Sequence, residues 1–344
     1  MTDVRFLTGG DVAPGRESGS GMFGEIAGHF QRADVSFLNL ENALSDRGEL
    51  LRGKAVYHRG NPAHVDGLVE AGLTCVNVAN NHVFDFGESS LFHTLEQLDR
   101  KGIGHFGAGR NIDEARESYI AEKKGLRFGF LGYTTTLPTG FTATPSSAGV
   151  NPLRVHTAYQ PKWNPIEYPG VAPAIVTWTD PVHLEQLRAD VAALAKRVNI
   201  VIVYVHWGSS MTPYVHDFQR EIGRTAIDAG AHAVFGGHQH VIAAIEFYQG
   251  RPIVHCSGNL LFDKWEPFFT DETLKTFLFG ATIGDDGLRD CFLLPANNGV
   301  GAPPRLLPRH EPLWQEIVDD VQAHSRGFGT RLVPRDGVVE VVPG

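Results

Sequence analysis

Short runs of β-branched and aromatic residues recur along the chain, and several of them stop at a residue that can bind a metal ion. In chain order, the five runs end at Asp11, at Glu41, at Asn81 and His82, at His206, and at His238 and His240. In α/β sheets, ligands bind in the crevice outside the carboxyl ends of the strands. Singly, a helix cap, a turn or a buried core histidine would explain these endings, but together they favour one metal site.

The segments between these runs have a helical pattern and alternate with the predicted strands. In residues 88–102, Leu91, Leu95 and Leu98 fall on one helical face, and in residues 180–197 an Asp precedes Pro181 at the expected helix start. Further helices are expected at 60–72, 219–229 and 312–325, and further strands at 123–133 and 337–342. This alternation predicts a layered α/β fold.

Residues 134–179 show no periodic pattern and contain seven prolines among Tyr159, Trp163 and Tyr168. Long irregular segments within a domain are usually functional or disordered, and the aromatic content argues against disorder. We expect an ordered lid over the metal cleft that excludes water and contacts the substrate. The alternative is a segment that only packs on the body and has no role at the cleft.

Composition narrows the possible functions. The chain has 344 residues, of which 42% are hydrophobic and 20% charged, as in an ordinary globular protein. Its formal net charge of −9 argues against nucleic acid as the main ligand, because binding to phosphate backbones needs a basic face. The chain enters its first strand at once and has no run of 18 apolar residues, so we expect a cytoplasmic protein without a membrane segment.

Other reactive groups give little support to alternative chemistry. Three widely spaced cysteines, Cys75, Cys256 and Cys291, are expected to be buried thiols rather than disulfides. No Gly-x-Ser-x-Gly elbow and no Walker-type loop occurs. The sequence therefore favours neither a serine nucleophile nor direct use of ATP.

A group of cations follows Glu41 and could bind an anionic substrate, although a solvated loop would look the same. The group consists of Arg47, Arg52, Lys54 and Arg59, and Arg16 from the first loop is a fifth candidate. We favour Lys54 and Arg59 for substrate contact, and add Arg16 and Asn42 to the candidate substrate-binding residues.

Several stretches, in the same order, resemble the CapA-like (poly-γ-glutamate capsule synthesis) family, a branch of the calcineurin-like metallophosphoesterase superfamily. They are Gly10-Asp11 with Gly15-Arg16, Phe37–Glu41, Ala79–His82 with Asp85, Val205–Gly208, Gly237–Val241 and Ser257–Asp263. The resemblance implies a four-layer α/β/β/α sandwich. We expect a catalytic domain over residues 1–297 and a C-terminal extension, 298–344, that packs on the core.

The same resemblance implies two divalent metal ions, Mn²⁺, Zn²⁺ or Fe²⁺. In that arrangement Asp11 and His240 bind the first metal, Glu41 bridges both, and the second metal takes Asn81, His206 and His238. His82 resembles the residue that protonates the leaving group. Asp85 would orient that imidazole, or would instead be a carboxylate at a helix start.

Two departures from the wider superfamily concern the expected metal ligands. The usual Asp-x-His motif reads Asp11-Val-Ala13 here, which removes one imidazole, and Glu41 stands where an Asp is usual. His58 is a candidate for the missing imidazole.

The resulting hypothesis is a metal-dependent hydrolase acting on an anionic small molecule or polymer. A phosphoesterase is the first reading, and an amidohydrolase acting on γ-glutamyl or related amides is the second. A non-catalytic accessory component of capsule polymer synthesis is the third. The sequence does not indicate an oligomeric state.

Overall fold

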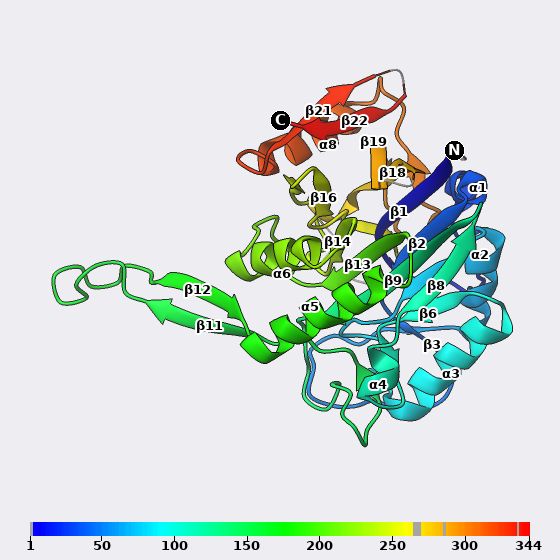
Figure 1. Ribbon diagram of the computed structural model, residues 1–344, viewed down its shortest axis with the longest axis horizontal. Helices are drawn as coiled ribbons and strands as arrows, with labels where there is room; N and C mark the ends of the chain where they lie inside the picture. The colour runs from blue at the N-terminus through cyan, green and yellow to red at the C-terminus, as the bar shows by residue number, and fades with distance from the viewer. Residues whose placement is uncertain (1–2, 264–269, 285–286, 336) are drawn as a thin grey trace.

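A computed structural model describes residues 3–263, 270–284, 287–335 and 337–344. Two β-sheets pack against each other, and helices cover their outer faces (Figure 1). Alternation along the strands produces these layers: in β13 (Ile200–His206), Ile202 and Tyr204 belong to the cluster between the sheets, whereas Val201 and Val203 pack against the outer helices. The predicted four-layer α/β/β/α sandwich is confirmed.

The first sheet has ten strands within the described residues. Its main path runs β21 (Thr330–Pro334), β22 (Val339–Pro343), β19 (Gly287–Asn297), β18 (Lys275–Gly284), β1 (Val4–Ala13), β2 (Val35–Leu40), β5 (Cys75–Asn77) and β6 (Gly104–Phe106), with β17 (Asn259–Phe262) paired to β1 and β20 (Arg305–Leu306) paired to β19. Strands β1, β2 and β5 are parallel, so their carboxyl ends meet at one edge.

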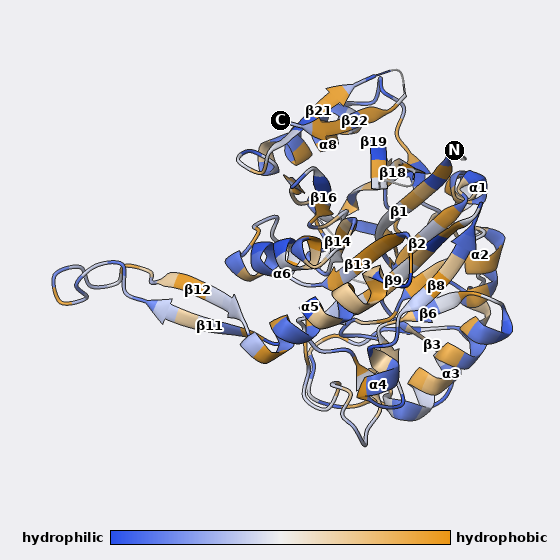
Figure 2. Ribbon diagram, viewed as in Figure 1, coloured by the Kyte–Doolittle hydropathy of each residue, from blue (hydrophilic) through white to orange (hydrophobic). Residues whose placement is uncertain are grey.

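The second sheet contributes the remaining strand ends. It runs β15 (Ile245–Tyr248), β16 (Arg251–Val254), β14 (Ala233–Gly237), β13, β9 (Leu126–Thr134) and β8 (Tyr119–Lys123). Strands β9, β13 and β14 are parallel. Figure 2 shows β1, β9 and β13 as predominantly hydrophobic, as expected for strands buried on both faces.

Helices cover both outer faces. On the first sheet lie α1 (Ala27–Arg32), α2 (Val65–Glu70) and α3 (Gly87–Arg100), and on the second lie α5 (Pro181–Ala195) and α6 (Asp217–Asp228). Asp180 caps α5, where its side chain accepts the N–H groups of Val182 and His183. Short elements complete the core: η1 (Gly24–Ile26), η2 (Pro62–His64), α4 (Ile112–Ala115), α7 (Asp271–Leu274), the pair β3 (Ala43–Leu44) and β4 (Arg59–Gly60), and the pair β7 (Ala108–Gly109) and β10 (Gly149–Val150).

The C-terminal residues continue the first sheet. Strand β22 pairs with β19, and α8 (Pro312–His324) buries Trp314 and Ile317 in the cluster between the sheets. The predicted helix and final strand in this region are thus confirmed. A domain boundary after residue 297 stays a prediction.

The segment 134–179 differs from its prediction. It is not irregular throughout, because β11 (Val155–Gln160) and β12 (Ala174–Thr179) form an antiparallel hairpin. The hairpin extends away from the body (Figure 1), and a lid role for this segment stays a prediction. Earlier in the segment, Phe141 is buried against Phe84 and lies 5.1 Å from Lys54 Nζ, so this part lies near the candidate site.

All three cysteines are buried free thiols, as predicted. Among the residues that the structure describes, no helix combines the length and apolar character needed to cross a bilayer. A cytoplasmic location stays a prediction.

Candidate metal centre

The carboxyl ends of β1, β2, β13 and β14 bring five candidate ligands into two groups that share Glu41. The first group is Asp11, Glu41 and His240, and the second is Glu41, His206 and His238. Within each group, one ligand atom from every residue lies within 4.8 Å of the others. The grouping has the same division between two metals that the sequence resemblance implies. Metal binding itself stays a prediction.

Glu41 lies at the junction of the two groups and is completely buried. Neither carboxylate oxygen has a hydrogen-bond partner among the described residues. Oε1 lies 3.2 Å from His206 Nε2 and 3.7 Å from His240 Nε2. Burial raises the pKa of Glu41 to about 8, because the charged form has lost its water. A buried carboxylate without donors is the group that a cation would stabilise.

Residues outside the first ligand group orient its side chains through hydrogen bonds. Asp11 Oδ1 accepts hydrogen bonds from Asn39 Nδ2 at 2.8 Å and from the Tyr204 hydroxyl at 2.9 Å, and Oδ2 accepts the His238 backbone N–H at 2.9 Å. Burial, followed by the nearby charge of Glu41, raises the pKa of Asp11 to about 7. His240 Nδ1 lies 2.9 Å from Asn259 Oδ1. That contact makes Nδ1 the donor and leaves Nε2 to face Glu41.

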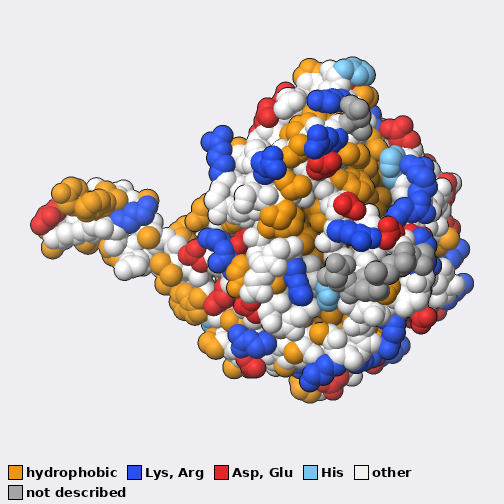
Figure 3. Space-filling model, turned by 45° about the horizontal axis from the view of Figure 1, so that its top comes forward, with side chains coloured by type: hydrophobic (Ala, Val, Ile, Leu, Met, Phe, Trp, Pro, Cys, Tyr) orange, Lys and Arg blue, Asp and Glu red, His pale blue; other side chains and the backbone are white. Residues whose placement is uncertain are grey.

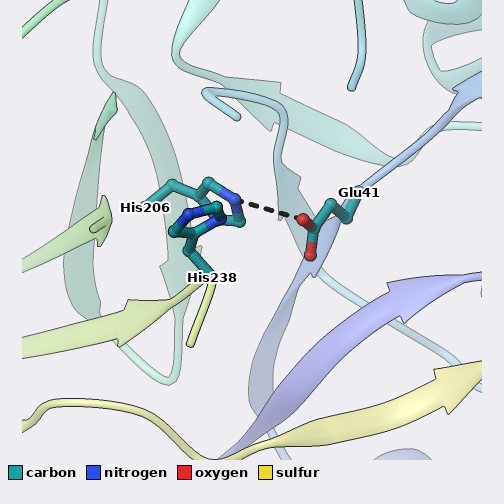
Figure 4. Close-up of side chains that lie close together, drawn as sticks. All are labelled: Glu41, His206 and His238. Carbon is teal, nitrogen blue, oxygen red and sulfur yellow. Dashed lines mark ion pairs between the residues drawn. The ribbon is translucent and has the colours of Figure 1, made fainter. Parts of the chain in front are cut away.

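The second ligand group contains an amide as well as two imidazoles. His206 Nε2 lies 2.8 Å from Asn81 Oδ1, which places the predicted ligand Asn81 beside this group. The rings of His206 and His238 are 4.8 Å apart, and Figure 4 shows both beside Glu41, with His206 directed at the carboxylate. His238 Nδ1 has no hydrogen-bond partner among the described residues. Burial lowers the pKa of both rings, to about 4 for His206, so both are neutral at pH 7, which is the form of imidazole that binds a metal.

The backbone of the turn after β14 lies unusually close to the side chains of Tyr204 and Asp11. A Cβ at Gly237 would lie 2.0 Å from the Tyr204 hydroxyl and 2.3 Å from Asp11 Oδ1, so only glycine fits there. His238 and His240 follow with φ angles of 85° and 57°, in the left-handed region that other residues rarely adopt. Such strain costs on the order of 1–3 kcal/mol per residue and is commonest at functional sites.

These residues fit divalent metal ions. The donors are carboxylate oxygens, an amide oxygen and neutral imidazoles, and no cysteine belongs to either ligand group. Such nitrogen and oxygen ligands suit Mn²⁺, Zn²⁺ and Fe²⁺. Two carboxyl groups with raised pKa values are enclosed by neutral rings, and the nearby Lys54 only partly offsets the charge of Glu41, so cations would stabilise the ionised form of this buried site.

His82 lies beside the ligands in a hydrogen-bonded cluster. Its Nδ1 is 2.7 Å from Asp85 Oδ2, and Lys54 Nζ contacts the other Asp85 oxygen and the Asn81 carbonyl. Asp85 also accepts the His58 backbone N–H at 2.8 Å. Asp85 is therefore placed to orient the imidazole. Burial, with the nearby His58 and Lys54, lowers the pKa of His82 well below its usual value.

Of the candidate substrate-binding residues, only Lys54 reaches this cluster. Arg16 forms an ion pair with Asp263 and donates to the Met22 carbonyl. Arg59 donates to the Arg47 and Gly48 carbonyls and stacks 3.6 Å over the Phe86 ring.

Asn42 donates to the Pro14 carbonyl at 2.9 Å, and the exposed Arg47 pairs with Glu96. Most cations of this loop bind protein groups. Arg16, Asn42 and Arg59 thus have structural contacts, and their expected role in substrate binding stays a prediction.

His58 does not join the first ligand group. Its ring lies 4.2 Å from the His82 ring and 5.2 Å from the Phe262 ring. The two ligand groups found among the described residues do not include it. The structure therefore places His58 next to the predicted proton donor, and Ala13 is not replaced by this imidazole.

Sequence reasoning missed the residues that hold the ligands. Asn39 lies two residues before Glu41, and Tyr204 two before His206, so each pair shares one face of its strand. Asn77 and Asn80 both donate to Asn39 Oδ1, and Asn80 Oδ1 accepts the His82 N–H. The i, i+2 spacing was the available signal for Asn39 and Tyr204, whereas the Asn259 contact with His240 depends on the tertiary fold.

Comparison with known proteins agrees with this picture. Residues 6–264 match the family described as "Bacterial capsule synthesis protein PGA_cap". The "PGA biosynthesis protein CapA" of Bacillus subtilis is 27% identical over 265 residues, covering 74% of this chain and 62% of that protein. A "Probable polyglutamine synthesis accessory protein" of Mycobacterium tuberculosis is 27% identical over 318 residues, covering 90% of this chain and 77% of that protein.

Among solved structures, a hypothetical protein from Thermus thermophilus is similar with a TM-score of 0.48 and 15% identity, covering 86% of this chain and all of that one. That likeness is too weak to transfer a function. The chain spans 62% of the length of the Bacillus subtilis relative, so that protein's activity and partners do not pass directly to this chain.

Proposed function

Because the chain belongs to the bacterial capsule synthesis (PGA_cap) family, we propose that it is a hydrolase that uses two divalent cations at this centre. The proposed substrate is an anionic phosphoester, either a monoester or a diester. The proposal rests above all on Glu41, a buried carboxylate without hydrogen-bond donors among the described residues that belongs to both ligand groups.

The proposed ligands divide as the two groups do. Asp11 and His240 would hold one cation, Asn81, His206 and His238 the other, and Glu41 both. Two cations held there would lower the pKa of a water molecule and neutralise negative charge on the substrate. The protein's own part is to fix the ligand atoms and to bury them from bulk water.

His82 is the proposed proton donor to the leaving group. Its Nδ1 is engaged by Asp85, which leaves Nε2 as the atom that gives a proton to the departing oxygen. The neutral ring must first gain that proton. An anionic substrate bound nearby would favour the charged imidazolium and oppose the pKa-lowering effect of burial.

Lys54 is the proposed contact for substrate charge. Its ammonium lies within the His82 and Asp85 cluster, and its side chain is only 11% exposed. A partly buried cation attracts an anion more strongly than a solvated one, because water screens it less.

A γ-glutamyl amide is the second candidate substrate. The Bacillus subtilis relative is named for poly-γ-glutamate (PGA) biosynthesis, and a carbonyl carbon can be attacked by the same activated water. In that reaction His82 would protonate the departing nitrogen. The accessory role named for the Mycobacterium tuberculosis relative is a third, non-catalytic candidate.

The test compares hydrolysis of p-nitrophenyl phosphate, bis-p-nitrophenyl phosphate and γ-glutamyl p-nitroanilide after reconstitution with Mn²⁺ or Zn²⁺. We expect phosphoester cleavage that falls about 10²-fold or more in His82→Ala, with metal content unchanged. Glu96→Gln, at a surface carboxylate paired with Arg47, is the matched control. Cleavage of the amide alone would select the second candidate. A metal-loaded protein inactive on all three substrates would support the non-catalytic role.

A further inference from the structure

The hairpin of residues 155–179, here called the arm, carries the largest group of exposed large apolar side chains among the described residues. Strands β11 and β12 pair from Val155 with Thr179 to Gln160 with Ala174. Residues 161–173 between them are all exposed. Figures 1 and 3 show the arm extending from the body, with hydrophobic side chains on its surface.

The base of the arm is fixed to the body. Thr179 is buried, and its N–H donates to Glu221 Oε2 at 2.8 Å on α6. His156 Nε2 lies 3.1 Å from Asp180 Oδ2, at the start of α5. The arm is therefore held in a defined direction at its base, whereas its outer half forms no hydrogen bond or ion pair with the body among the described residues.

Large apolar side chains occupy both faces and the tip of the arm. The exposed fractions are 70% for Tyr159, 61% for Trp163, 89% for Ile166, 50% for Tyr168, 48% for Val171, 58% for Ile175, 37% for Val176 and 40% for Trp178. Tyr159 and Ile175 form a cross-strand pair on one face, and Trp163 lies 5.6 Å from Tyr168 at the tip. An isolated two-stranded hairpin is only marginally stable in water, so these contacts alone do not account for an ordered arm.

A groove lies beside the arm. It has a volume of about 490 Å³ and lies between Lys162, Ile175 and neighbouring arm residues on one side and Ser209, Tyr214 and His216 on the other. The loop on that side follows the metal-ligand residue His206, and the Met211 N–H donates to the Gln239 carbonyl at 2.8 Å. The groove thus borders the loops that carry the candidate ligands.

We propose that this chain forms a two-fold dimer in which the tip of each arm lies in the groove of a second copy. In such an exchange every contact occurs twice, because the same surface serves both subunits. Trp163 and Ile166 would be the main apolar contacts, packing beside Ile175 and Tyr214 of the partner subunit. This proposal does not depend on the proposed hydrolase activity.

The exposed area suits a dimer. At about 150–250 Å² for a whole aromatic side chain, the four exposed aromatic residues of the arm present on the order of 400 Å² of surface. The isoleucines, the valines and the groove itself add to this on each copy. A stable interface buries about 800 Å² per partner.

Charge also favours a second copy. Between residues 155 and 179, Lys162 and Glu167 are the only Lys, Arg, Asp or Glu residues. Two-fold exchange would place Glu167 of one copy near the partner's Lys162, and the reverse contact would form at the same time. The charges of Lys162 and Glu167 cancel within each arm, so contact between two arms adds no local repulsion, whereas the net charge of −9 of the whole chain opposes docking on an anionic membrane.

The prolines of the arm favour a closed pair over open-ended assembly. Pro161, Pro165, Pro169 and Pro173 lie around its tip. Proline lacks the N–H needed to extend a sheet, and natural proteins use it to block pairing at strand edges. The exposed side chains thus remain available while growth of a fibre is hindered.

Sedimentation velocity of the full chain, from low to high micromolar concentration, tests this proposal. We expect the wild-type protein to dimerise and Trp163→Ser/Ile166→Ser to raise the dissociation constant on the order of 100-fold. Val69→Ser, at an exposed residue on α2, is the control and should leave the dimer intact. Thermal unfolding and metal uptake of the arm variant should match the wild type, which separates loss of docking from loss of folding.

A charge exchange gives the sharper test. Lys162→Glu and Glu167→Lys should each weaken the dimer a few-fold, and the double variant should restore it. A wild-type chain that is monomeric at every concentration would overturn the proposal, as would a dimer unaffected by Trp163→Ser/Ile166→Ser. Arm-dependent binding of the monomer to neutral phosphatidylcholine vesicles would identify a membrane as the occupant instead.

Discussion

The two ligand groups of the proposed metal centre differ in the number of ligands and in how firmly those ligands are held. The first has three ligands, but Asp11 accepts three hydrogen bonds and His240 contacts Asn259. The second adds Asn81 to its imidazoles, yet His238 Nδ1 has no partner among the described residues. In the proposed centre, these outer contacts would compensate for a missing ligand, since they would orient the remaining ones before a metal binds.

The largest effect is expected from Glu41→Gln, because Glu41 is the ligand that the two groups share. Both metals should be lost or strongly weakened, and hydrolysis should fall on the order of 10³-fold or more. Metal analysis after dialysis, together with phosphoesterase assays, measures this. Glu96→Gln is the control. Retention of both metals by Glu41→Gln would show that the two groups do not share this ligand.

A comparison of His240→Ala with His238→Ala directly tests the difference in ligand number between the two groups. His240→Ala leaves only Asp11 and Glu41 in the first group, so we expect it to retain one metal per chain. His238→Ala leaves Glu41, Asn81 and His206 in the second group, and that metal should bind more weakly but still be detected. Titration of metal-free protein with Mn²⁺ measures both. Equal losses in the two variants would remove the proposed asymmetry.

Asn259 tests whether a contact from outside the ligand group orients His240. Asn259→Ala removes the acceptor of His240 Nδ1 without removing a ligand, and should weaken the first metal by about 10–100-fold. Asn259→Asp keeps an acceptor and should recover most of that affinity. A first metal that binds equally well in Asn259→Ala would mean that this contact does not prepare the site.

The smallest effect concerns stability of the metal-free protein. The pKa values of Asp11, about 7, and Glu41, about 8, lie above those of an unfolded chain. The folded state therefore keeps protons that the unfolded state releases, and this contribution to stability is lost as pH rises through 7 and 8.

The buried histidines affect stability at lower pH than the two carboxyl groups do. The pKa values of His206, about 4, and His240, about 3, are lowered, so their contribution is lost as pH falls below 6.5. The metal-free protein should therefore unfold at a lower temperature at pH 8.5 than at pH 6.5. Mn²⁺ should reverse the difference, and Glu41→Gln should reduce it. Thermal unfolding with and without EDTA measures this, and higher stability of the metal-free protein at pH 8.5 would contradict it.

The sequence predicted the residues that gather at the site because a strand ending is a local feature. Asp11, Glu41 and His206 each follow a hydrophobic run, and parallel strands bring such ends together. Contacts that depend on the path of a loop could not be predicted from a local sequence pattern. Lys54 and Arg59 look alike in sequence, yet one reaches Asp85 and the other stacks on Phe86.

The arm shows the same limit. Its prolines and aromatic residues predicted an unusual functional segment, but composition does not encode the direction in which a segment extends. Pairing of β11 with β12 and the hydrogen bond from Thr179 to Glu221 set that direction. Part of the expected lid, residues 155–179, is an extended hairpin, and the lid role itself stays a prediction.

The most direct test of the proposed centre is a crystal structure of the Mn²⁺-reconstituted protein with an anomalous difference map. We expect two peaks, one beside Asp11 and His240 and one beside Asn81, His206 and His238, with Glu41 contacting both. A single peak, or none within reach of Glu41, would contradict the dinuclear centre on which the proposed function rests.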